Sequence, residues 1–346
     1  MTSGETVLVT GGAGFIGSNY VRFLLQEKGC CVVNLDALTY AGHLETLEGI
    51  GDWSEHHFVL GSVGDRSLVD YLMKRYQPVA VVHFAAETHV DRSIDSPDVF
   101  MRANVMGTSK LLESTRIYWN CLSTEKQRAF RFVHISSDKV YGSLTHDDDR
   151  SDENSAYRPC SPYAASKAAS NHLIQSYVQT YGLPLLTVNG SKIFGAYQYP
   201  EALIPRVIRN AVLGQVLSVS RSGENVRDWL FVEDFCRAID RVLEAGRSGE
   251  VYNVGGGNEM KNEDVVNSLC GSLVEASEDF PFSRQSCLAE FSDNPPGRNL
   301  RYAMDCTKIG EELGWAPQES FATGLAKTVA WYLEHQNWCR KVMESR

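Results

Sequence analysis

The sequence lacks the cysteine pattern of a disulfide-bonded or zinc-binding protein. Its nine cysteines are odd in number and scattered, and none belongs to a Cys-x-x-Cys pair. We therefore expect reduced thiols and a cytoplasmic location. Long apolar runs are absent too, since none approaches the roughly 18 residues of a membrane-spanning helix. A strand-like segment near the start also stands where a signal peptide would begin, so we expect no membrane partner and no export.

Positive charge is scarce. The chain has 33 lysines and arginines against 43 aspartates and glutamates, which gives a formal net charge of −10. Nucleic acids and anionic membranes attract basic surfaces, so we expect neither as a partner. The acidic segment 145–154 lacks the spacing of a calcium-binding loop, and we expect a solvated loop and no metal site.

The 346-residue chain does contain an alternation of short β-rich runs with longer helical stretches. The runs are TVLVT, CVVNLD, HFVLG, AVVHFAA, FRFVHISS and LLTVNGS. The stretches 98–120 and 161–181 are predicted helices, and the second can be capped by Ser161 with Pro162 in its first turn. This alternation is typical of an α/β protein with a parallel sheet and crossover helices. After about residue 195 the pattern becomes irregular, which predicts a smaller C-terminal α/β lobe.

A glycine-rich turn follows the first predicted strand. Gly11, Gly14 and Gly17 are spaced so that backbone N–H groups can approach a pyrophosphate at the start of a helix. Asp36 ends the second predicted strand, 19 residues after Gly17. A carboxylate there accepts from both ribose hydroxyls and repels a 2′-phosphate. This combination predicts a Rossmann-type doubly wound sheet that binds NAD rather than NADP.

A second group of residues is suited to hydride transfer. Tyr163 and Lys167 are four residues apart, so on a helix they share one face. A tyrosine hydroxyl beside an ammonium has a lowered pKa and can accept an alcohol proton during oxidation. Ser137, at the end of an earlier predicted strand, would hydrogen-bond the same oxygen. A Tyr-x-x-x-Lys pattern is common on helix surfaces, but here the glycine turn, Asp36 and Ser137 precede it in the required order.

With these motifs the sequence resembles the extended short-chain dehydrogenase/reductase family nearly end to end. Within that family it is most similar to dTDP-glucose 4,6-dehydratases, through LDALTYAGHLETL, HFAAETHVDRSI, SPYAASKAA, YQYPEALIP, GENVRDWLFVEDF and LGWAPQESFATGLAKTVAWYL. We expect residues 1–195 to form the NAD-binding domain, with some later segments returning to it, and residues 196–346 mainly the nucleotide-sugar-binding lobe. The cofactor contacts implied are Gly11, Gly14, Phe15, Ile16, Gly17, Asp36, Thr39, Ser62, Val63, Ala85, Tyr163 and Lys167.

The resemblance also implies the chemistry. In this family the sugar is oxidised at C4, water leaves across C5–C6, and the hydride returns to C6. For this chain it implies an NAD-dependent nucleotide-sugar 4,6-dehydratase, a lyase of deoxysugar biosynthesis acting on dTDP-glucose or a similar hexose. Tyr163 would be the base for C4 oxidation, Lys167 would lower its pKa and hold the nicotinamide ribose, and Ser137 would support the C4 oxygen. A homodimer through a four-helix bundle of 98–120 and 161–181 is implied too, although apolar stripes there could equally face their own core.

The two residues after Ser137 depart from the family pattern. Where dTDP-glucose enzymes carry Thr-Asp-Glu, this chain carries Ser137-Asp138-Lys139. One hypothesis keeps the reaction, because dehydratases of CDP-glucose and inverting ones of UDP-N-acetylglucosamine resemble this Asp-Lys pattern. Asp138 would then protonate the leaving C6 hydroxyl, and Lys139, made neutral by desolvation and nearby positive charge, would remove the C5 proton. The alternatives are an epimerase or other non-dehydrating enzyme, and a non-catalytic nucleotide-sugar-binding protein.

The expected substrate pocket shows further departures. Ala202 replaces a family lysine, Pro295 stands where an arginine contacts the nucleotide, and Lys192 stands where an asparagine contacts the diphosphate. Arg227 is retained and should hold the diphosphate. The nucleotide base and the hexose therefore stay open, with thymidine favoured over UDP and CDP. The predicted substrate-binding residues are Thr88, His89, Lys192, Leu203, Asn225, Arg227 and Arg298.

Overall fold

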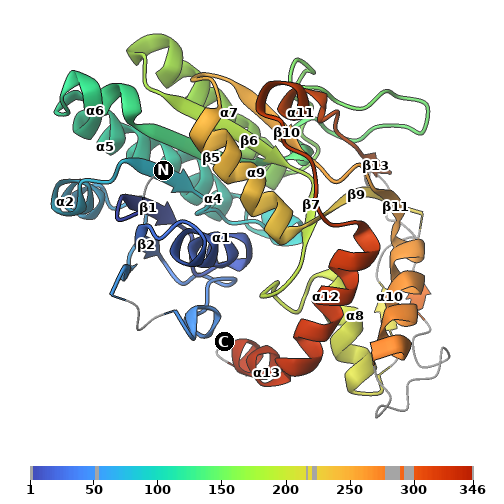
Figure 1. Ribbon diagram of the computed structural model, residues 1–346. Helices are drawn as coiled ribbons and strands as arrows, with labels where there is room; N and C mark the ends of the chain where they lie inside the picture. The colour runs from blue at the N-terminus through green and yellow to red at the C-terminus, as the bar shows by residue number, and fades with distance from the viewer. Residues whose placement is uncertain are drawn as a thin grey trace.

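A seven-stranded parallel sheet lies at the centre of the computed structural model, which describes residues 3–50, 54–215, 217–219, 224–276, 289–291 and 300–344 (Figure 1). The strands follow the order β3-β2-β1-β4-β5-β6-β10, and every neighbouring pair runs parallel. Their bounds are β1 Thr6–Thr10, β2 Cys31–Asp36, β3 His56–Leu60, β4 Ala80–His83, β5 Arg131–Ser137, β6 Leu185–Gly190 and β10 Val251–Val254. The order reverses between β1 and β4, which confirms the predicted doubly wound Rossmann-type fold and places a ligand crevice at that point.

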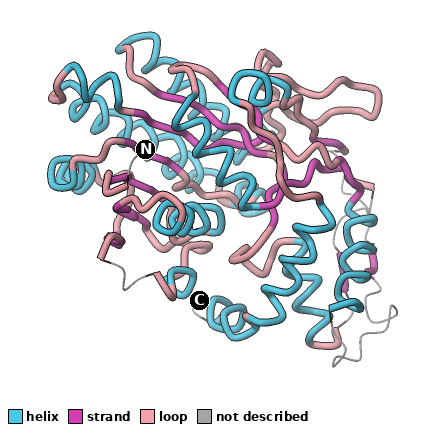
Figure 2. Tube along the Cα trace, viewed as in Figure 1, coloured by secondary structure: helices cyan, strands magenta, loops and turns pink. Residues whose placement is uncertain are grey.

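Helices cover both faces of this sheet (Figures 1 and 2). One face carries α1 Phe15–Gln26, α9 Val232–Ala245 and α11 Thr307–Leu313, and the other carries α2 Arg66–Tyr76, α5 Thr108–Asn120 and α7 Pro162–Tyr181. Side chains alternate along a strand, so each strand supplies both layers. In β1, Val7 and Val9 belong to the core that holds Tyr20, whereas Leu8 belongs to the core that holds Leu111.

The stretches 98–120 and 161–181 are both helical, but only the second forms one regular α-helix. In α7 the Ser161 hydroxyl accepts from the N–H of Ala164 at 3.1 Å and Pro162 is the first residue, as predicted. The stretch 98–120 instead consists of α4, a π-helical segment η2 and α5, with α4 at Pro97–Phe100 and η2 at Met101–Gly107. The Asn104 amide in η2 donates to the carbonyl of Glu87 at 3.0 Å and to the hydroxyl of Ser166 at 2.8 Å. It thereby joins the loop after β4 to α7.

The C-terminal part supplies a smaller sheet and its own helices, which matches the predicted α/β lobe. β9 is central, with β7 and β13 parallel to it and β11 antiparallel. Figure 1 shows α8, α10 and α12 gathered together beside this sheet. The bounds are β7 Lys192–Phe194, β9 Val226–Phe231, β11 Glu259–Lys261, β13 Arg301–Tyr302, α8 Leu203–Val212, α10 Asn262–Ala276, α12 Phe321–Glu334 and α13 Gln336–Glu344, with β8 Leu217–Val219 pairing β12 Ala289–Phe291. The domain boundary at residue 195 stays a prediction.

Short helical segments complete the fold. They are η1 Leu44–Leu47, α3 Val90–Asp95, α6 Thr124–Ala129 and η3 Asp138–Val140. Of these, α3 and η3 follow the carboxyl ends of β4 and β5, the edge at which α/β sheets bind ligands. In the part of the chain that the structure describes, no helix combines the length and the apolar character needed to cross a membrane.

Candidate active site

The glycine-rich turn between β1 and α1 leaves no space for a side chain at Gly11 or Gly17. Gly11 has a φ of 77°, and a Cβ there would lie 2.6 Å from the backbone nitrogen of Ala85. A Cβ on Gly17 would collide with the carbonyl of Gly11, so α1 packs directly on the turn. Gly14 precedes α1 and provides no side-chain cap. The first N–H groups of α1 are therefore suited to an anionic group such as a pyrophosphate.

Asp36 lies beside this turn at the end of β2. Its Oδ2 accepts from the N–H of Ala13 and its Oδ1 from the N–H of Leu38, both at 2.8 Å. Burial raises the pKa of this carboxyl, and the two backbone hydrogen bonds oppose the rise. A carboxylate has about four lone-pair sites, so Asp36 can accept further hydrogen bonds from a ribose.

The other predicted cofactor residues follow the same edge of the sheet. Phe15 and Ile16 open α1, Thr39 follows β2, Ser62 and Val63 follow β3, and Ala85 follows β4. These strands are parallel, so their carboxyl ends lie along one edge. The structure thus brings all the predicted cofactor residues to one side of the sheet, and their contacts with a cofactor stay a prediction.

Ser137, Tyr163 and Lys167 meet next to this edge. Ser137 ends β5, and the other two lie in the first two turns of α7. The hydroxyl of Ser137 is hydrogen-bonded to Tyr163 and donates to Oδ1 of Asp138 at 2.9 Å. The ammonium of Lys167 donates to the carbonyl of Ile135 at 2.7 Å, and burial lowers the pKa of Lys167 to about 7. The predicted hydride-transfer residues are therefore joined through β5.

The pKa of Tyr163 moves in the direction opposite to the expectation from sequence. Burial raises the pKa of Tyr163 to about 12, the hydrogen bond between Tyr163 and Ser137 opposes the rise, and the Asp138 carboxylate adds to it. The ammonium of Lys167 is directed to a β5 carbonyl and does not offset this rise. In the protein alone, Tyr163 is therefore a protonated phenol at neutral pH, ready to donate a hydrogen bond.

The Asp138-Lys139 pair lies in η3, directly after β5. The Asp138 side chain is 5% exposed, and burial raises its pKa, which the charges of Lys139, Arg227 and Lys192 oppose. A carboxyl with a raised pKa keeps its proton to higher pH, as a general acid requires. The Lys139 Nζ lies 5.5 Å from the centre of the Tyr163 ring. The candidate acid, the candidate base and the tyrosine therefore share one site.

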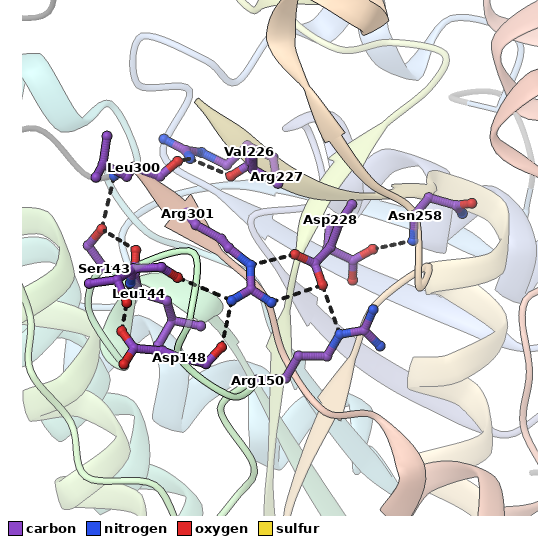
Figure 3. Close-up of polar contacts among 12 residues, drawn as sticks. Ser143, Leu144, Asp148, Arg150, Val226, Arg227, Asp228, Asn258, Leu300 and Arg301 are labelled. Atoms are coloured by element: carbon purple, nitrogen blue, oxygen red, sulfur yellow. Dashed lines mark hydrogen bonds and ion pairs between the residues drawn. The ribbon is translucent and has the colours of Figure 1, made fainter. Parts of the chain in front are cut away.

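Two cationic residues of the smaller sheet face the same region. Lys192 is in β7 and Arg227 is in β9, which are adjacent parallel strands. The Arg227 guanidinium lies 4.9 Å from the centre of the Tyr302 ring, and its Nη1 donates to the carbonyl of Leu300 at 3.2 Å (Figure 3). Both cations act on the pKa of Asp138. Cationic side chains of this kind can bind a diphosphate, and that role of these two residues stays a prediction.

Thr88 and His89 connect the loop after β4 to neighbouring loops. The Thr88 hydroxyl lies 2.9 Å from the hydroxyl of Tyr40. The His89 Nε2 lies 3.7 Å from an Oε2 of Glu201, just before α8. Glu201 lies within the motif YQYPEALIP, so this motif could have pointed to Glu201 as a residue near the site. Of the other predicted substrate residues, Leu203 opens α8, Asn225 directly precedes β9, and Arg298 lies outside the described residues.

Asp228 is a further residue of this region that sequence patterns did not predict. Burial raises the pKa of Asp228 to about 6, and the Asp138 carboxylate contributes. Its Oδ1 accepts from the N–H of Asn258 at 2.8 Å (Figure 3). Its Oδ2 accepts from the N–H of Gly256 at 3.1 Å. These bonds fix the turn after β10 against the strand that carries Arg227. The sequence feature that could have indicated Asp228 is its position directly after Arg227.

The acidic segment 145–154 is exposed at its tip, as predicted, but it is also bound to the smaller sheet (Figure 3). The Nε atoms of Arg150 and Arg301 lie 2.8 and 2.7 Å from the carboxylate of Glu259. Arg301 also donates to the carbonyl of Asp148 at 2.7 Å. The segment therefore holds β13 in place. Among the described residues no group of three His, Cys, Asp or Glu side chains is arranged to hold a metal ion.

The doubly wound sheet, the glycine turn with Asp36, and Tyr163 with Lys167 on α7 define an extended short-chain dehydrogenase/reductase. The comparison with protein families narrows this class. The family described as GDP-mannose 4,6 dehydratase matches residues 8–328, and the chain belongs to this family.

Known relatives agree with this assignment. The chain is 50% identical over 341 residues to a dTDP-glucose 4,6-dehydratase of Xanthomonas campestris, covering 98% of this chain and 96% of the relative. The dTDP-glucose 4,6-dehydratase of Streptomyces venezuelae, solved with NAD bound, has a TM-score of 0.87 at 40% identity, covering 97% of this chain and 99% of that one. A UDP-glucose 4-epimerase of Thermotoga maritima reaches a TM-score of 0.83 at 26% identity, over 96% and 99% of the two chains. The fold therefore serves both activities, and site residues must distinguish them.

Proposed function

We propose that the chain is an NAD-dependent nucleotide-sugar 4,6-dehydratase that acts on dTDP-glucose. The observation that carries this proposal is the meeting of Asp138 and Lys139 with Ser137 and Tyr163 at the end of β5. A dehydratase needs an acid and a base for water elimination beside a tyrosine for oxidation. The identity of 50% to a dTDP-glucose 4,6-dehydratase supports thymidine as the nucleoside.

The glycine turn fits NAD. Any side chain at Gly11 or Gly17 would fill the turn, and Gly14 leaves the start of α1 without a side-chain cap. Asp36 lies where a carboxylate receives ribose hydroxyls and repels a 2′-phosphate, so NADP is disfavoured. When bound, NAD accepts the hydride from C4 of the sugar and returns it to C6, so no net NADH forms.

Tyr163 and Ser137 would act on the C4 hydroxyl. Tyr163, as phenolate, accepts its proton while the C4–H bond breaks, and Ser137 holds the same oxygen by a hydrogen bond. Lys167 would hold the nicotinamide ribose, and burial lowers its pKa to about 7, so its ammonium and amine forms coexist at neutral pH. The C4 ketone that forms acidifies the C5 hydrogen.

Asp138 and Lys139 would then eliminate water. A neutral Lys139 takes the C5 proton. The electron pair of the broken C5–H bond then forms the C5–C6 double bond as the C6–O bond breaks. Asp138 gives its proton to the departing oxygen, which leaves as water. After hydride addition at C6, Lys139 returns its proton to C5, and Asp138 regains one from solvent. Arg227 and Lys192 would hold the diphosphate meanwhile.

A panel of dTDP-, UDP-, CDP- and GDP-hexoses in deuterated water tests this function by mass spectrometry. We expect dTDP-glucose to lose the mass of one water molecule and to gain deuterium at C5, with no net NADH. An unchanged mass with a new isomer would indicate an epimerase, which Lys139 at the family's glutamate position would explain. Tight binding without turnover would indicate a binding protein.

We also propose that the protein forms a homodimer through a four-helix bundle. Apolar side chains on the helices of the expected four-helix bundle are exposed in the single chain, namely Val99, Met101, Met106, Ile117 and Tyr181. Exposed apolar surface of this kind is typical of an interface. We expect Met106→Glu to convert a dimer into a monomer in sedimentation velocity. Tyr71→Glu, on α2 outside the bundle, should leave the dimer intact, and a monomeric wild-type protein would contradict the proposal.

We also infer a cytoplasmic location. The cysteines that the structure describes are all free thiols, and Cys30, Cys236, Cys270 and Cys339 are buried. Reduced, unpaired cysteines are typical of proteins in a reducing compartment. Fractionation of cells that produce the protein would test this location.

A further inference from the structure

We propose that Tyr141 is a positioning residue that holds Asp138 and Lys139 in the geometry required for water elimination. This inference rests on the proposed function. Tyr141 directly follows η3, the turn that contains both residues, and its backbone N–H donates to the carbonyl of Asp138 at 3.1 Å. A displacement of the Tyr141 side chain would therefore shift the acid and the base together.

The hydroxyl of Tyr141 reaches a buried cluster of three asparagines from three different elements. It donates to Oδ1 of Asn253 on β10 at 2.8 Å and accepts from Nδ2 of Asn189 on β6 at 2.9 Å. Asn189 in turn accepts from Nδ2 of Asn171 on α7 at 3.2 Å. Asn253 donates onward to the carbonyl of Ser151 at 3.1 Å. Each amide donates toward the next group, so the Tyr141 hydroxyl has one orientation in the cluster.

This asparagine cluster connects the parts of the site that perform different steps. Asn171 lies one helical turn after Lys167, on the helix that also carries Tyr163. Asn189 lies three residues before Lys192, the candidate diphosphate ligand. The Tyr141 hydroxyl therefore fixes η3 relative to both the oxidation residues and the phosphate site. The hydroxyl is hydrogen-bonded within the cluster, so we assign it a positioning role and no proton transfer of its own.

The backbone of the turn has a second anchor, which lets the hydroxyl be removed without loss of the fold. The N–H of Arg158 donates to the carbonyl of Val140 at 2.9 Å, and Gly142 has a φ of 89° and packs against Arg158. The Tyr141 ring also contacts that of Tyr157, with centres 5.4 Å apart. After Tyr141→Phe the turn would remain, but it would lose the hydrogen bonds that connect Tyr141 to Asn189 and Asn253.

Tyr141→Phe should therefore slow elimination more than oxidation. We expect kcat with dTDP-glucose to fall about tenfold, since small misplacements of reacting groups cost up to about 10²-fold, while KM stays within about twofold. The fraction of enzyme-bound nicotinamide in the reduced form, measured by absorbance at steady state, should rise several-fold above that of wild type. Deuterium entry at C5 should slow in parallel with product formation.

Tyr157→Phe is the matched control, because its hydroxyl accepts from Asn171 at 3.1 Å and is hydrogen-bonded to Asn189 in the same cluster, and in the described part of the chain neither partner belongs to η3. We expect this variant to keep the wild-type fraction of reduced nicotinamide. Unchanged turnover in Tyr141→Phe, or a fall in turnover without a rise in reduced nicotinamide, would overturn the positioning role. If Tyr141→Phe does not fold, Asn189→Ser removes the donor to the hydroxyl and should give the same rise. A wild-type protein that dehydrates no hexose would refute the proposed function instead.

Discussion

Replacing Tyr163 by phenylalanine is expected to reduce turnover of dTDP-glucose by about 10³-fold, the range in which general base catalysis contributes. The hydroxyl is the only group lost, and the ring keeps its edge contact with Phe100, whose centre lies 6.4 Å away. KM and the NAD content of the purified protein should therefore stay close to wild type. Turnover is measured by mass spectrometry, and oxidation by the rate at which enzyme-bound NADH appears in a single turnover.

The same helix provides the control. Tyr177→Phe removes a hydroxyl that lies 3.4 Å from Glu113 and far along α7 from the site, and it should leave turnover unchanged. The pH dependence gives a second readout. Since burial raises the pKa of Tyr163 to about 12, the phenolate fraction grows about tenfold per pH unit below that value, and oxidation should accelerate with pH. Full activity in Tyr163→Phe would assign the proton transfer to another group. The same conclusion would follow if the oxidation rate of this variant rose with pH as steeply as that of wild type.

The parts of the fold that sequence predicts are those determined by local chemistry. The runs TVLVT and CVVNLD form β1 and β2 at the predicted residues because short β-branched runs suit buried parallel strands. Ser161 and Pro162 begin α7 as predicted because a cap and a first-turn proline act within a few residues. The glycine turn is predictable for the same reason, since its spacing already defines the space it needs.

The features that sequence did not predict depend on partners distant in the chain. Some later segments are expected to return to the first domain, but nothing in VYNV specifies that β10 pairs with β6. The π-helical segment η2 contains a buried amide, Asn104, that bonds groups 17 and 62 residues away. The raised pKa values of Tyr163 and Asp228 are effects of burial, which a sequence motif does not contain. The same holds for the asparagine cluster around Tyr141.

Replacing Asp138 by asparagine and Lys139 by methionine is expected to block elimination at two different points. Each change should lower the formation of dehydrated product by at least about 10²-fold, as loss of a general acid or base does. Asp138→Asn keeps the base, so substrate recovered from deuterated water should carry deuterium at C5. Lys139→Met removes the base, so recovered substrate should carry none. Mass spectrometry of the recovered sugar distinguishes the two cases.

The pH dependence should separate these roles further. Burial raises the pKa of Asp138, so the acid form persists to higher pH than in an exposed aspartate. The contribution of Asp138 as an acid should be full below this raised pKa and should decline as pH rises through it, because only the protonated carboxyl can donate. In Asp138→Asn the residual elimination should lose this alkaline decline. An unchanged decline in that variant would assign the acid to another residue, and Asp228 would be the first to test because burial raises its pKa to about 6.

Lys139→Arg determines whether Lys139 acts as a base or only as a positive charge. Arginine keeps the charge but is not deprotonated in proteins, so it cannot accept the C5 proton. If Lys139 is the base, Lys139→Arg should fail to exchange deuterium, as Lys139→Met does, while NADH still forms. If Lys139→Arg still dehydrates the substrate, Lys139 is not the base. The positive charge of Lys139, 5.5 Å from the centre of the Tyr163 ring, would instead favour the phenolate that oxidation needs. A Lys139→Glu variant more active than wild type would indicate that the lysine marks a function other than dehydration, because glutamate would then supply the base that the wild-type site lacks.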